Sequence, residues 1–289
     1  NPINVMLTPD EVRYVVEDRG AKVIIGSADK AEPLLDLKGS GGLNEVVLFG
    51  EQVTTGASSF EDWLKTGADS FDVAQRGRDE LAAICYTSGT TGHPKGAMHS
   101  HRNIVTNAHG TALMHVRTAG DVLVNSLPLP HVYGSVVFNS SFMYGMTLVI
   151  VPRFEEEAIL SAIQQHRATI LDGVPTVYYY LLSHPKFDDY DLSSLTRSTV
   201  GGQTLPAAKS IEWTKRVTTP VLELWGMTEL AGAATANPYY GDNKPGTIGL
   251  MYPGSEGKIV SADDRDVELG TGEEGELMVR GPLVMLGYY

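Results

Sequence analysis

Residues 86–96 of the chain, YTSGTTGHPKG, bring together the groups that proteins use to bind phosphate. Glycine allows the backbone to adopt positive φ and to turn its N–H groups toward an anion. The hydroxyl side chains add hydrogen-bond donors, and Lys95 adds a positive charge. The apolar stretch 81–85 before this run is typical of a buried strand. We therefore expect a strand followed by a phosphate-binding loop, with contacts from Thr87, Ser88, Gly89, Thr90, Thr91, Gly92 and Lys95.

The spacing of this loop differs from that of the Walker motif. The pattern G-x-x-x-x-G-K-[ST] has a glycine before the lysine and a hydroxyl residue after it. This chain has Pro94 and Gly96 at these two positions, which disfavours a P-loop kinase or GTPase. An ordinary solvated turn is disfavoured as well, because turn composition alone seldom collects so many of these residues.

The bulk composition narrows the possible function classes. The chain has 289 residues, 42% of them hydrophobic, which allows about two domains of ~150 residues with a sizeable core. The net charge of −13 argues against a nucleic-acid partner, whose phosphates would be repelled. The one cysteine, Cys85, excludes an internal disulfide and is expected to be a buried thiol, which fits a cytoplasmic protein. No apolar run reaches the ~20 residues of a transmembrane helix, and no signal peptide is apparent.

Helix and strand patterns alternate along most of the chain. Thr8, Pro9 and Glu11 predict the capped start of a helix that ends near Gly20. After Gly246 the pattern changes to short β segments separated by glycines. The predicted fold class is therefore α/β, with parallel-type sheets layered with helices and followed by a small partial β-barrel element. The other expected helices are 101–115, 155–166, 176–183 and 206–215, and the expected strands are 22–25, 45–49, 121–127, 147–151, 169–171, 198–200, 221–224, 258–261 and 275–280.

Two histidines and two acidic runs lie outside these motifs. His99 and His101 are closely spaced, but no cysteine or third ligand accompanies them, so we expect a loop exit and a helix start rather than a metal site. The acidic runs 155–157 and 263–266 are expected to be solvated surface.

Five segments, in order, resemble the motifs of the adenylate-forming enzymes, the superfamily of acyl-CoA synthetases, peptide-synthetase adenylation domains and beetle luciferases. The resemblance spans essentially the whole chain, and five motifs in the family's order are a specific signal. It implies that the phosphate loop closes over the β- and γ-phosphates of ATP. The segments are the phosphate loop, 127–134 (LPLPHVYG), 200–205 (VGGQTL), 224–229 (LWGMTE), and 246–249 (GTIG) followed by 275–281 (GELMVRG).

The resemblance assigns roles to the residues that follow the predicted strand 221–224. Thr228 would contact the α-phosphate, and Glu229 would bind Mg²⁺, a cation that suits a carboxylate together with phosphate oxygens. Trp225 stands where the family usually has tyrosine, and its indole would flank the adenine. Gly226 and Met227 complete the nucleotide-binding residues of this segment.

A second nucleotide-binding segment follows the predicted strand 198–200. Gly201 and Gly202 match the turn that lies against the adenine face in the family, because only glycine lets a backbone approach that closely. Gln203 stands where the family commonly has a small residue, so its contact with the nucleotide is less well defined.

The segment 127–134 indicates the class of acid. Peptide-synthetase domains carry an aspartate near this point for the substrate's amino group, and none lies between Asn125 and Ser141, so an amino acid substrate is disfavoured. His131 and Tyr133 resemble the acyl-side residues of acyl-CoA synthetases, with His131 near the reacting carboxylate. Val174 and Thr176 match a segment that lines the acyl pocket. A medium- or long-chain fatty acid is expected, with aryl acids as the next choice.

The resemblance predicts three parts and one overall reaction. The parts are a first α/β subdomain at 1–116, incomplete at its N-terminus and ending in the phosphate loop, a second at 117–245 with the acyl and adenine sites, and a β-rich segment at 246–289. A carboxylic acid and ATP would give acyl-AMP, and reaction of acyl-AMP with CoA would then give acyl-CoA. The protein is expected to be cytoplasmic, and a homodimer is possible in the same prediction.

The resemblance also implies family parts that this chain lacks, including a mobile C-terminal domain with the lysine that assists adenylation. We therefore expect a truncated core that binds nucleotide and is inactive in isolation. Two alternatives stay open, a non-catalytic nucleotide-binding module and a luciferase-like oxidase, because both retain the same motifs.

Overall fold

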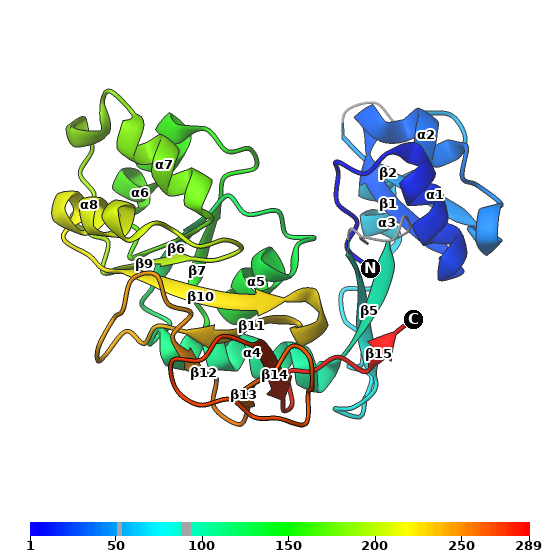
Figure 1. Cartoon of the computed structure of the whole chain (residues 1–289). Helices are drawn as coiled ribbons and strands as arrows, with labels where there is room; N and C mark the ends of the chain where they lie inside the picture. The colour runs from blue at the N-terminus through cyan, green and yellow to red at the C-terminus, as the bar shows by residue number, and fades with distance from the viewer. Residues whose placement is uncertain (51–53, 88–93) are drawn as a thin grey trace. The chain divides into compact units, whose positions relative to one another are not determined.

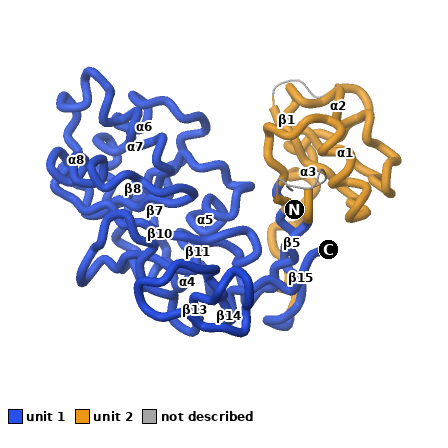
Figure 2. Tube along the Cα trace, in the orientation of Figure 1, with its two compact units in different colours: residues 1–2, 77–85, 96–289 blue, residues 3–76, 86–95 orange. Residues whose placement is uncertain are grey.

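The computed structural model describes residues 1–50, 54–87 and 94–289. This part of the chain forms two compact units, which are coloured separately in Figure 2. Unit 1 comprises residues 1–2, 77–85 and 96–289, and unit 2 comprises residues 3–76 and 86–95. The three-part division expected from the sequence stays a prediction.

Unit 2 is built on a small parallel sheet of order β1-β2-β3. Its strands are β1 (Val23–Ser27), β2 (Glu45–Phe49) and β3 (Ser58–Ser59). Its helices are α1 (Pro9–Asp18), α2 (Ala31–Leu35) and α3 (Phe60–Thr66), with short 3₁₀ turns η1 (Ala28–Lys30) and η2 (Ser40–Gly42). The apolar core of this unit comes from Val16, Ile24, Ala31, Leu34, Leu37, Leu43, Val46 and Leu48.

Helix α1 begins as the sequence predicts. The Thr8 side chain accepts a hydrogen bond from the Glu11 N–H, and the Glu11 carboxylate accepts one from the Thr8 N–H at 2.8 Å. This reciprocal pair satisfies two donors that the first turn of a helix leaves unpaired. Pro9 occupies the first helical position, and Gly20 follows the helix with a positive φ of 58°.

Unit 1 contains a seven-stranded sheet of order β12-β11-β10-β9-β8-β6-β7. The five strands from β10 to β7 run parallel. Strand β11 pairs antiparallel with β10, and β12 pairs antiparallel with β11. The strands are β6 (Val122–Asn125), β7 (Thr147–Ile150), β8 (Ile170–Gly173), β9 (Arg197–Val200), β10 (Val221–Met227), β11 (Gly232–Ala236) and β12 (Leu250–Met251).

Helices cover both faces of this sheet. Leu123 and Ile170 belong to a core cluster with residues of α5 and β11, whereas their neighbours Val124 and Leu171 belong to a cluster with residues of α6, α7 and α8. This alternation follows from the two-residue period of a strand. Figure 1 shows α6, α7 and α8 on one side of the sheet and α4 on the other. The helices are α4 (His101–Met114), α5 (Val132–Tyr144), α6 (Glu156–His166), α7 (Pro175–Ser183) and α8 (Ala207–Val217), with 3₁₀ turns η3 (Phe187–Asp189) and η4 (Thr228–Leu230).

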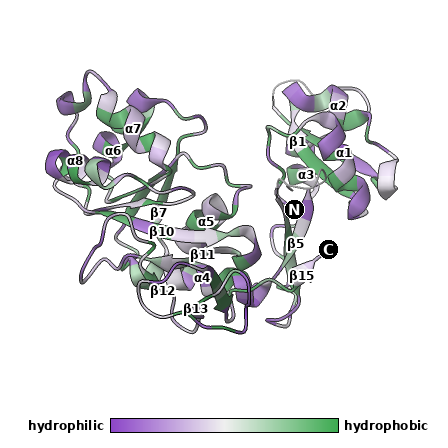
Figure 3. Ribbon diagram, viewed as in Figure 1, coloured by the Kyte–Doolittle hydropathy of each residue, from purple (hydrophilic) through white to green (hydrophobic). Residues whose placement is uncertain are grey.

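Helix α8 illustrates why these helices pack onto the sheet. It carries both hydrophilic and hydrophobic residues (Figure 3), and Trp213 and Val217 are buried four residues apart on one face. Trp213 also donates a 3.1 Å hydrogen bond to the Ser198 hydroxyl in β9, which satisfies its buried indole N–H. None of the helices in the described ranges combines the length and apolar composition needed to cross a membrane.

The chain after Gly246 is composed of strands and loops, as predicted, but its strands join three different sheets. Strand β12 extends the large sheet, and β13 (Glu256–Val260) pairs with β14 (Glu276–Arg280) in a separate antiparallel pair. Strand β15 (Gly287–Tyr288) pairs with β5 (Lys95–Ser100), which is the middle strand of a sheet of order β15-β5-β4, where β4 is Leu81–Thr87. The sequence indicates the β character of this segment, whereas the distribution of its strands is a tertiary property.

Candidate active site

The carboxyl ends of three neighbouring parallel strands, β8, β9 and β10, form the centre of the candidate site. Gly173 and Glu223 are both in register with Val200, and the Gly201 N–H donates to the Gly173 carbonyl at 3.2 Å. Strand β10 then continues to Met227 beyond the end of β9. Ligands of open α/β sheets bind at this edge of the sheet, where the strands end.

The two glycines after β9 lie where a side chain has no room. A Cβ atom at Gly201 would lie 2.4 Å from Cδ1 of Leu224 and 3.3 Å from Cε1 of Tyr133. Gly202 has a φ of 87°, and the nearest atom to a Cβ there would be Cγ1 of Val174 at 3.4 Å. The structure therefore brings Gly201 and Gly202 together with Tyr133 and Val174, which come from different motifs of the sequence. Gln203 follows them as an exposed residue.

The end of β10 is shaped by a β-bulge. The register with β11 shifts between Trp225 and Gly226, and a Cβ at Gly226 would lie only 1.9 Å from the Gly232 carbonyl oxygen. Only glycine fits there. Trp225 is half-buried and packs against the core cluster of Leu224, whereas Met227 is exposed. The predicted contacts of these residues with adenine stay predictions.

The turn at Thr228 is held by a histidine from β5. The Thr228 carbonyl oxygen lies 2.7 Å from Nε2 of His99. A carbonyl can only accept, so the hydrogen bond requires that Nε2 carry the proton. Burial lowers the pKa of His99, which favours the neutral ring. His99 lies inside strand β5, which follows the phosphate loop, and not in the loop exit that the sequence predicts. His101 is the first residue of α4, as predicted.

Glu229 accepts hydrogen bonds from a residue of β15 and from a residue just before that strand. The Tyr288 hydroxyl donates a 2.6 Å hydrogen bond to Oε1 of Glu229, and the Met285 N–H donates to the Glu229 carbonyl at 2.8 Å. The hydrogen bond to Glu229 raises the pKa of Tyr288, so the phenol stays protonated. Because a carboxylate has about four acceptor positions, Glu229 can bind a cation as well.

The residues at this turn fit a magnesium ion that enters together with a nucleotide. Mg²⁺ keeps several waters and uses one or two carboxylates plus phosphate oxygens. Glu229 is half-buried and supplies one such carboxylate. In the described ranges, no group of three or more His, Cys, Asp or Glu side chains could hold a metal ion by themselves.

The phosphate loop is described only at its two ends. Ser88, Gly89, Thr90, Thr91, Gly92 and His93 lie outside the described residues, so their predicted contacts stay predictions. Thr87 at the end of β4 donates from its hydroxyl to the Lys95 carbonyl at 3.5 Å, and the Lys95 side chain is exposed. Within unit 2, the Tyr86 hydroxyl donates to the Asp18 carboxylate of α1, which anchors the start of the loop.

His131 and Thr176 begin two helices. His131 precedes α5 as its N-cap, and its Nδ1 accepts a 3.2 Å hydrogen bond from the Tyr133 N–H. His131 is exposed as a whole residue, but burial of its ring lowers the pKa of the imidazole. Thr176 is an exposed residue in the first turn of α7. Contact of these residues with an acid substrate stays a prediction.

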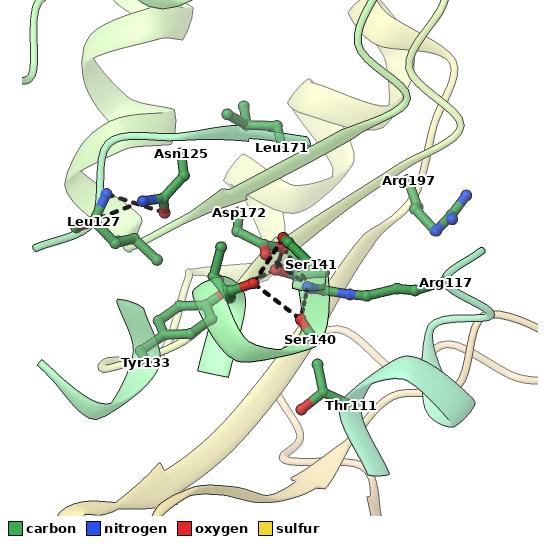
Figure 4. A network of polar contacts seen from close by, with 12 residues as sticks. Thr111, Arg117, Asn125, Leu127, Tyr133, Ser140, Ser141, Leu171, Asp172 and Arg197 are labelled. Atoms are coloured by element: carbon green, nitrogen blue, oxygen red, sulfur yellow. Dashed lines mark hydrogen bonds and ion pairs between the residues drawn. The ribbon is translucent and has the colours of Figure 1, made fainter. Parts of the chain in front are cut away.

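A buried polar network lies behind Tyr133 (Figure 4). The Tyr133 hydroxyl lies 2.6 Å from Oγ1 of Thr199, and the Thr199 hydroxyl donates to Oδ1 of Asp172. Asp172 accepts two hydrogen bonds from Nη2 of Arg117, at 2.9 and 2.8 Å, and both side chains of this ion pair are fully buried. Arg117 also donates to Ser140 at 3.1 Å.

Sequence reasoning missed these supporting residues. Asp172 gave one usable signal, because a carboxylate in the otherwise apolar strand Ile170–Gly173 must be paired when it is buried. Thr199 in β9 and Tyr288 in β15 gave no such signal, since each is an ordinary strand residue whose partner is distant in the chain. Cys85 is buried, as expected.

Comparison with known proteins supports the resemblance inferred from the motifs. The family model described as AMP-binding enzyme matches residues 1–289. The long-chain-fatty-acid–CoA ligase of Bacillus subtilis (strain 168) is 35% identical over 213 residues, which cover 73% of this chain and 38% of that protein. The long-chain-fatty-acid–CoA ligase of Escherichia coli O157:H7 is 30% identical over 318 residues, which cover 99% of this chain and 56% of that protein.

A solved structure matches the fold over nearly the whole chain. ATP-bound MatB from Rhodopseudomonas palustris aligns with a TM-score of 0.90 and 33% sequence identity, covering 99% of this chain and 56% of that chain. The predicted α/β class, with parallel sheets layered with helices, is thus confirmed. The chain spans about half the length of the Escherichia coli relative and of this structural neighbour.

Proposed function

Since this chain belongs to the AMP-binding enzyme family, we propose that it supplies the nucleotide- and acid-binding core of an ATP-dependent acid–CoA ligase. In the first step, a carboxylate oxygen attacks the α-phosphorus of ATP, the bond to pyrophosphate breaks, and acyl-AMP forms. In the second step, the sulfur of the CoA thiolate attacks the acyl carbon and AMP leaves with the bonding electrons. The mixed anhydride makes this second step feasible, because AMP is a far better leaving group than oxide.

The observation that carries this proposal is the convergence of separate motifs at one edge of the large sheet. Gly201 has no room for a side chain beside Leu224 and Tyr133, so the backbone itself forms this surface. A flat ring such as adenine can approach a glycine backbone closely. The turn at Thr228 and Glu229 follows the neighbouring strand β10.

We propose the following roles for the polar residues. Thr228 donates to the α-phosphate, and Lys95, with the hydroxyl groups of the phosphate loop, neutralises charge that develops on pyrophosphate. Glu229 would hold Mg²⁺, which supplies charge neutralisation on the phosphate oxygens when it is bound. His131 would lie near the reacting carboxylate, where its ring can donate a hydrogen bond from Nε2 while Nδ1 accepts from the Tyr133 N–H.

The proposed acid is a medium- or long-chain fatty acid. Both relatives described above are named for long-chain fatty acids. Val174 would contact the acyl group, since it is half-buried and packs against the core cluster that contains the buried ring of Tyr133. Thr176 lies nearby in the first turn of α7. Cytoplasmic location and a homodimer stay predictions.

Acid-dependent exchange of labelled pyrophosphate into ATP tests the reaction. We expect exchange with octanoate or palmitate and little with acetate, benzoate or amino acids, in the protein that carries this chain. Lys95→Met should lower exchange at least tenfold, whereas Lys65→Met, a change of the same chemistry in the exposed helix α3, should leave it unchanged. Exchange with no acid, despite binding of AMP, would favour a nucleotide-binding module instead.

A further inference from the structure

We propose that Thr199 and Asp172 are positioning residues that fix the ring of Tyr133 as a rigid wall of the acid pocket. In this way they would determine which acyl shapes the protein accepts. The inference rests on the proposed function, because it concerns the acid side of that site. Neither residue belongs to the motifs that identify the site, and both side chains are completely buried.

The hydrogen bonds of this network have only one consistent direction. Asp172 accepts both of its hydrogen bonds from Arg117, one on each carboxylate oxygen. The Thr199 hydroxyl has one proton, which it gives to Asp172. Thr199 must therefore accept from Tyr133, whose hydroxyl is the donor of the 2.6 Å hydrogen bond between them.

This direction makes Tyr133 a fixed structural element of the site. Burial raises the pKa of Tyr133, so its phenol stays protonated and keeps donating to Thr199. The other end of the residue is held as well, because its N–H donates to Nδ1 of His131. With both ends held, the ring edge faces Gly201, where Cε1 would lie 3.3 Å from an added Cβ. Since the hydroxyl already has a partner, the ring and not the hydroxyl would face the acyl group.

The desolvation cost of the buried ion pair between Arg117 and Asp172 gives a reason to connect this pair with the acid site. Burying an arginine and an aspartate completely carries a large desolvation cost, and a well-packed apolar pair is often at least as stable. Buried ion pairs are retained in some proteins because they specify one arrangement. Here the arrangement includes a path from Asp172 through Thr199 to Tyr133, whereas Ser140 contacts Arg117 on a separate branch.

The branch through Thr199 and the branch through Ser140 can be tested separately by matched substitutions. Thr199→Val removes the hydroxyl at nearly constant shape, Thr199→Ser keeps the hydroxyl, and Ser140→Ala removes the other hydroxyl of the network. Tyr133→Phe removes the donor at the far end and is an independent variant should Thr199→Val fold poorly. The probes are hydrolysis-resistant acyl sulfamoyl adenosines with hexadecanoyl, octanoyl or benzoyl groups, and AMP, with affinities from isothermal titration calorimetry.

We expect wild-type protein and Thr199→Ser to discriminate among the acyl groups to the same extent. Thr199→Val and Tyr133→Phe should each move the ratio of hexadecanoyl to benzoyl affinity at least fivefold toward one. The AMP affinity of Thr199→Val should stay within twofold of wild type. The double variant should show no further change, because both substitutions release the same ring. Ser140→Ala should leave the ratio unchanged even where it lowers the melting temperature.

Three results would overturn the inference. An unchanged ratio in Thr199→Val and Tyr133→Phe would mean that the ring does not set acyl selectivity. An equal shift in Ser140→Ala would mean that general loosening of the core is responsible. If AMP binds but no acyl probe binds more tightly than AMP in wild-type protein, the proposed ligase function itself fails, and the inference fails with it.

Discussion

Tyr288 donates a 2.6 Å hydrogen bond to Oε1 of Glu229, a residue that lies 59 positions earlier in the chain. The Met285 N–H holds the carbonyl of the same glutamate, so two groups near β15 fix both its side chain and its backbone. His99 of β5 holds the preceding carbonyl, that of Thr228, and β5 pairs with β15. The turn proposed to bind magnesium and phosphate thus depends on strands from both ends of unit 1.

Removing the Tyr288 hydroxyl should weaken binding of Mg·ATP. A hydrogen bond to a charged group contributes about 1.5–3 kcal/mol, and an exposed one contributes less, so Tyr288→Phe should weaken binding about fivefold to tenfold. Isothermal titration with Mg·ATP and with metal-free ATP measures this, and only the former should change. Tyr289→Phe, next to it in the sequence, is the matched control and should bind as wild type does. Tighter binding by Tyr288→Phe would show that the phenol competes with the cation.

Adding one methyl group at Gly201 should damage the site. Its Cβ would lie 2.4 Å from Cδ1 of Leu224, so Gly201→Ala forces that buried side chain to move. Overpacking of this kind costs about 1–3 kcal/mol of folding free energy, and AMP affinity should fall at least tenfold. Gly120→Ala is the control, since its nearest neighbour would be Thr118 at an ordinary 3.7 Å. Urea denaturation measures the loss of folding free energy, and titration with AMP measures the loss of affinity. If Gly201→Ala binds AMP as tightly as wild type does, adenine does not bind at this position.

Much of the fold follows from local signals in the sequence. The capping box of Thr8 and Glu11 predicts where α1 begins, and alternating helix and strand patterns predict the parallel sheet. These features depend on residues close together in the chain, where turn chemistry and periodicity act directly. The glycine-rich end of β9 was predictable for the same reason, because Gly201 and Gly202 follow an apolar strand.

The parts that sequence reasoning missed depend on contacts between distant residues. Tyr288 and Glu229 are joined only when β15 pairs with β5, and Thr199 meets Asp172 only because β8 and β9 are neighbours in the sheet. Strand order cannot be read from periodicity, which describes one element at a time. For the same reason the strands after Gly246 were predicted correctly as strands, whereas their distribution among three sheets was not predicted.

Breaking the buried ion pair should destabilise unit 1 strongly. Arg117→Met leaves the Asp172 carboxylate buried without its counter-charge, which costs about 3–5 kcal/mol. The exposed pair Arg280 and Glu256 is the control, because Arg280→Met there should change stability by less than about 1 kcal/mol. The free energy of unfolding from urea titrations at pH 7.5 measures both. Equal effects of the two substitutions would mean that Asp172 finds another partner or water in the variant.

The stability of the protein should fall as the pH drops below about 6.5, with His115 as a main cause. His115 is completely buried, and burial together with the charges of Arg117 and Arg197 holds its pKa well below the usual value. At pH values between the pKa of His115 in the folded protein and ~6.5, the unfolded chain therefore binds a proton that the folded protein does not bind. The stability is fully present above pH 6.5 and is lost as the pH falls, by up to about 1.4 kcal/mol per pH unit for one such group.

A variant without this group should show a shallower dependence on pH. Urea titrations from pH 7.5 to 5.0 should give a smaller slope for His115→Gln than for wild type, whatever its stability at pH 7.5. Some slope should remain, because burial also lowers the pKa of His99 and adds a change in the same direction. His166→Gln, at an exposed position near the end of α6, should leave the slope unchanged. Equal slopes for wild type and His115→Gln would mean that protonation of His115 is not what the folded protein resists.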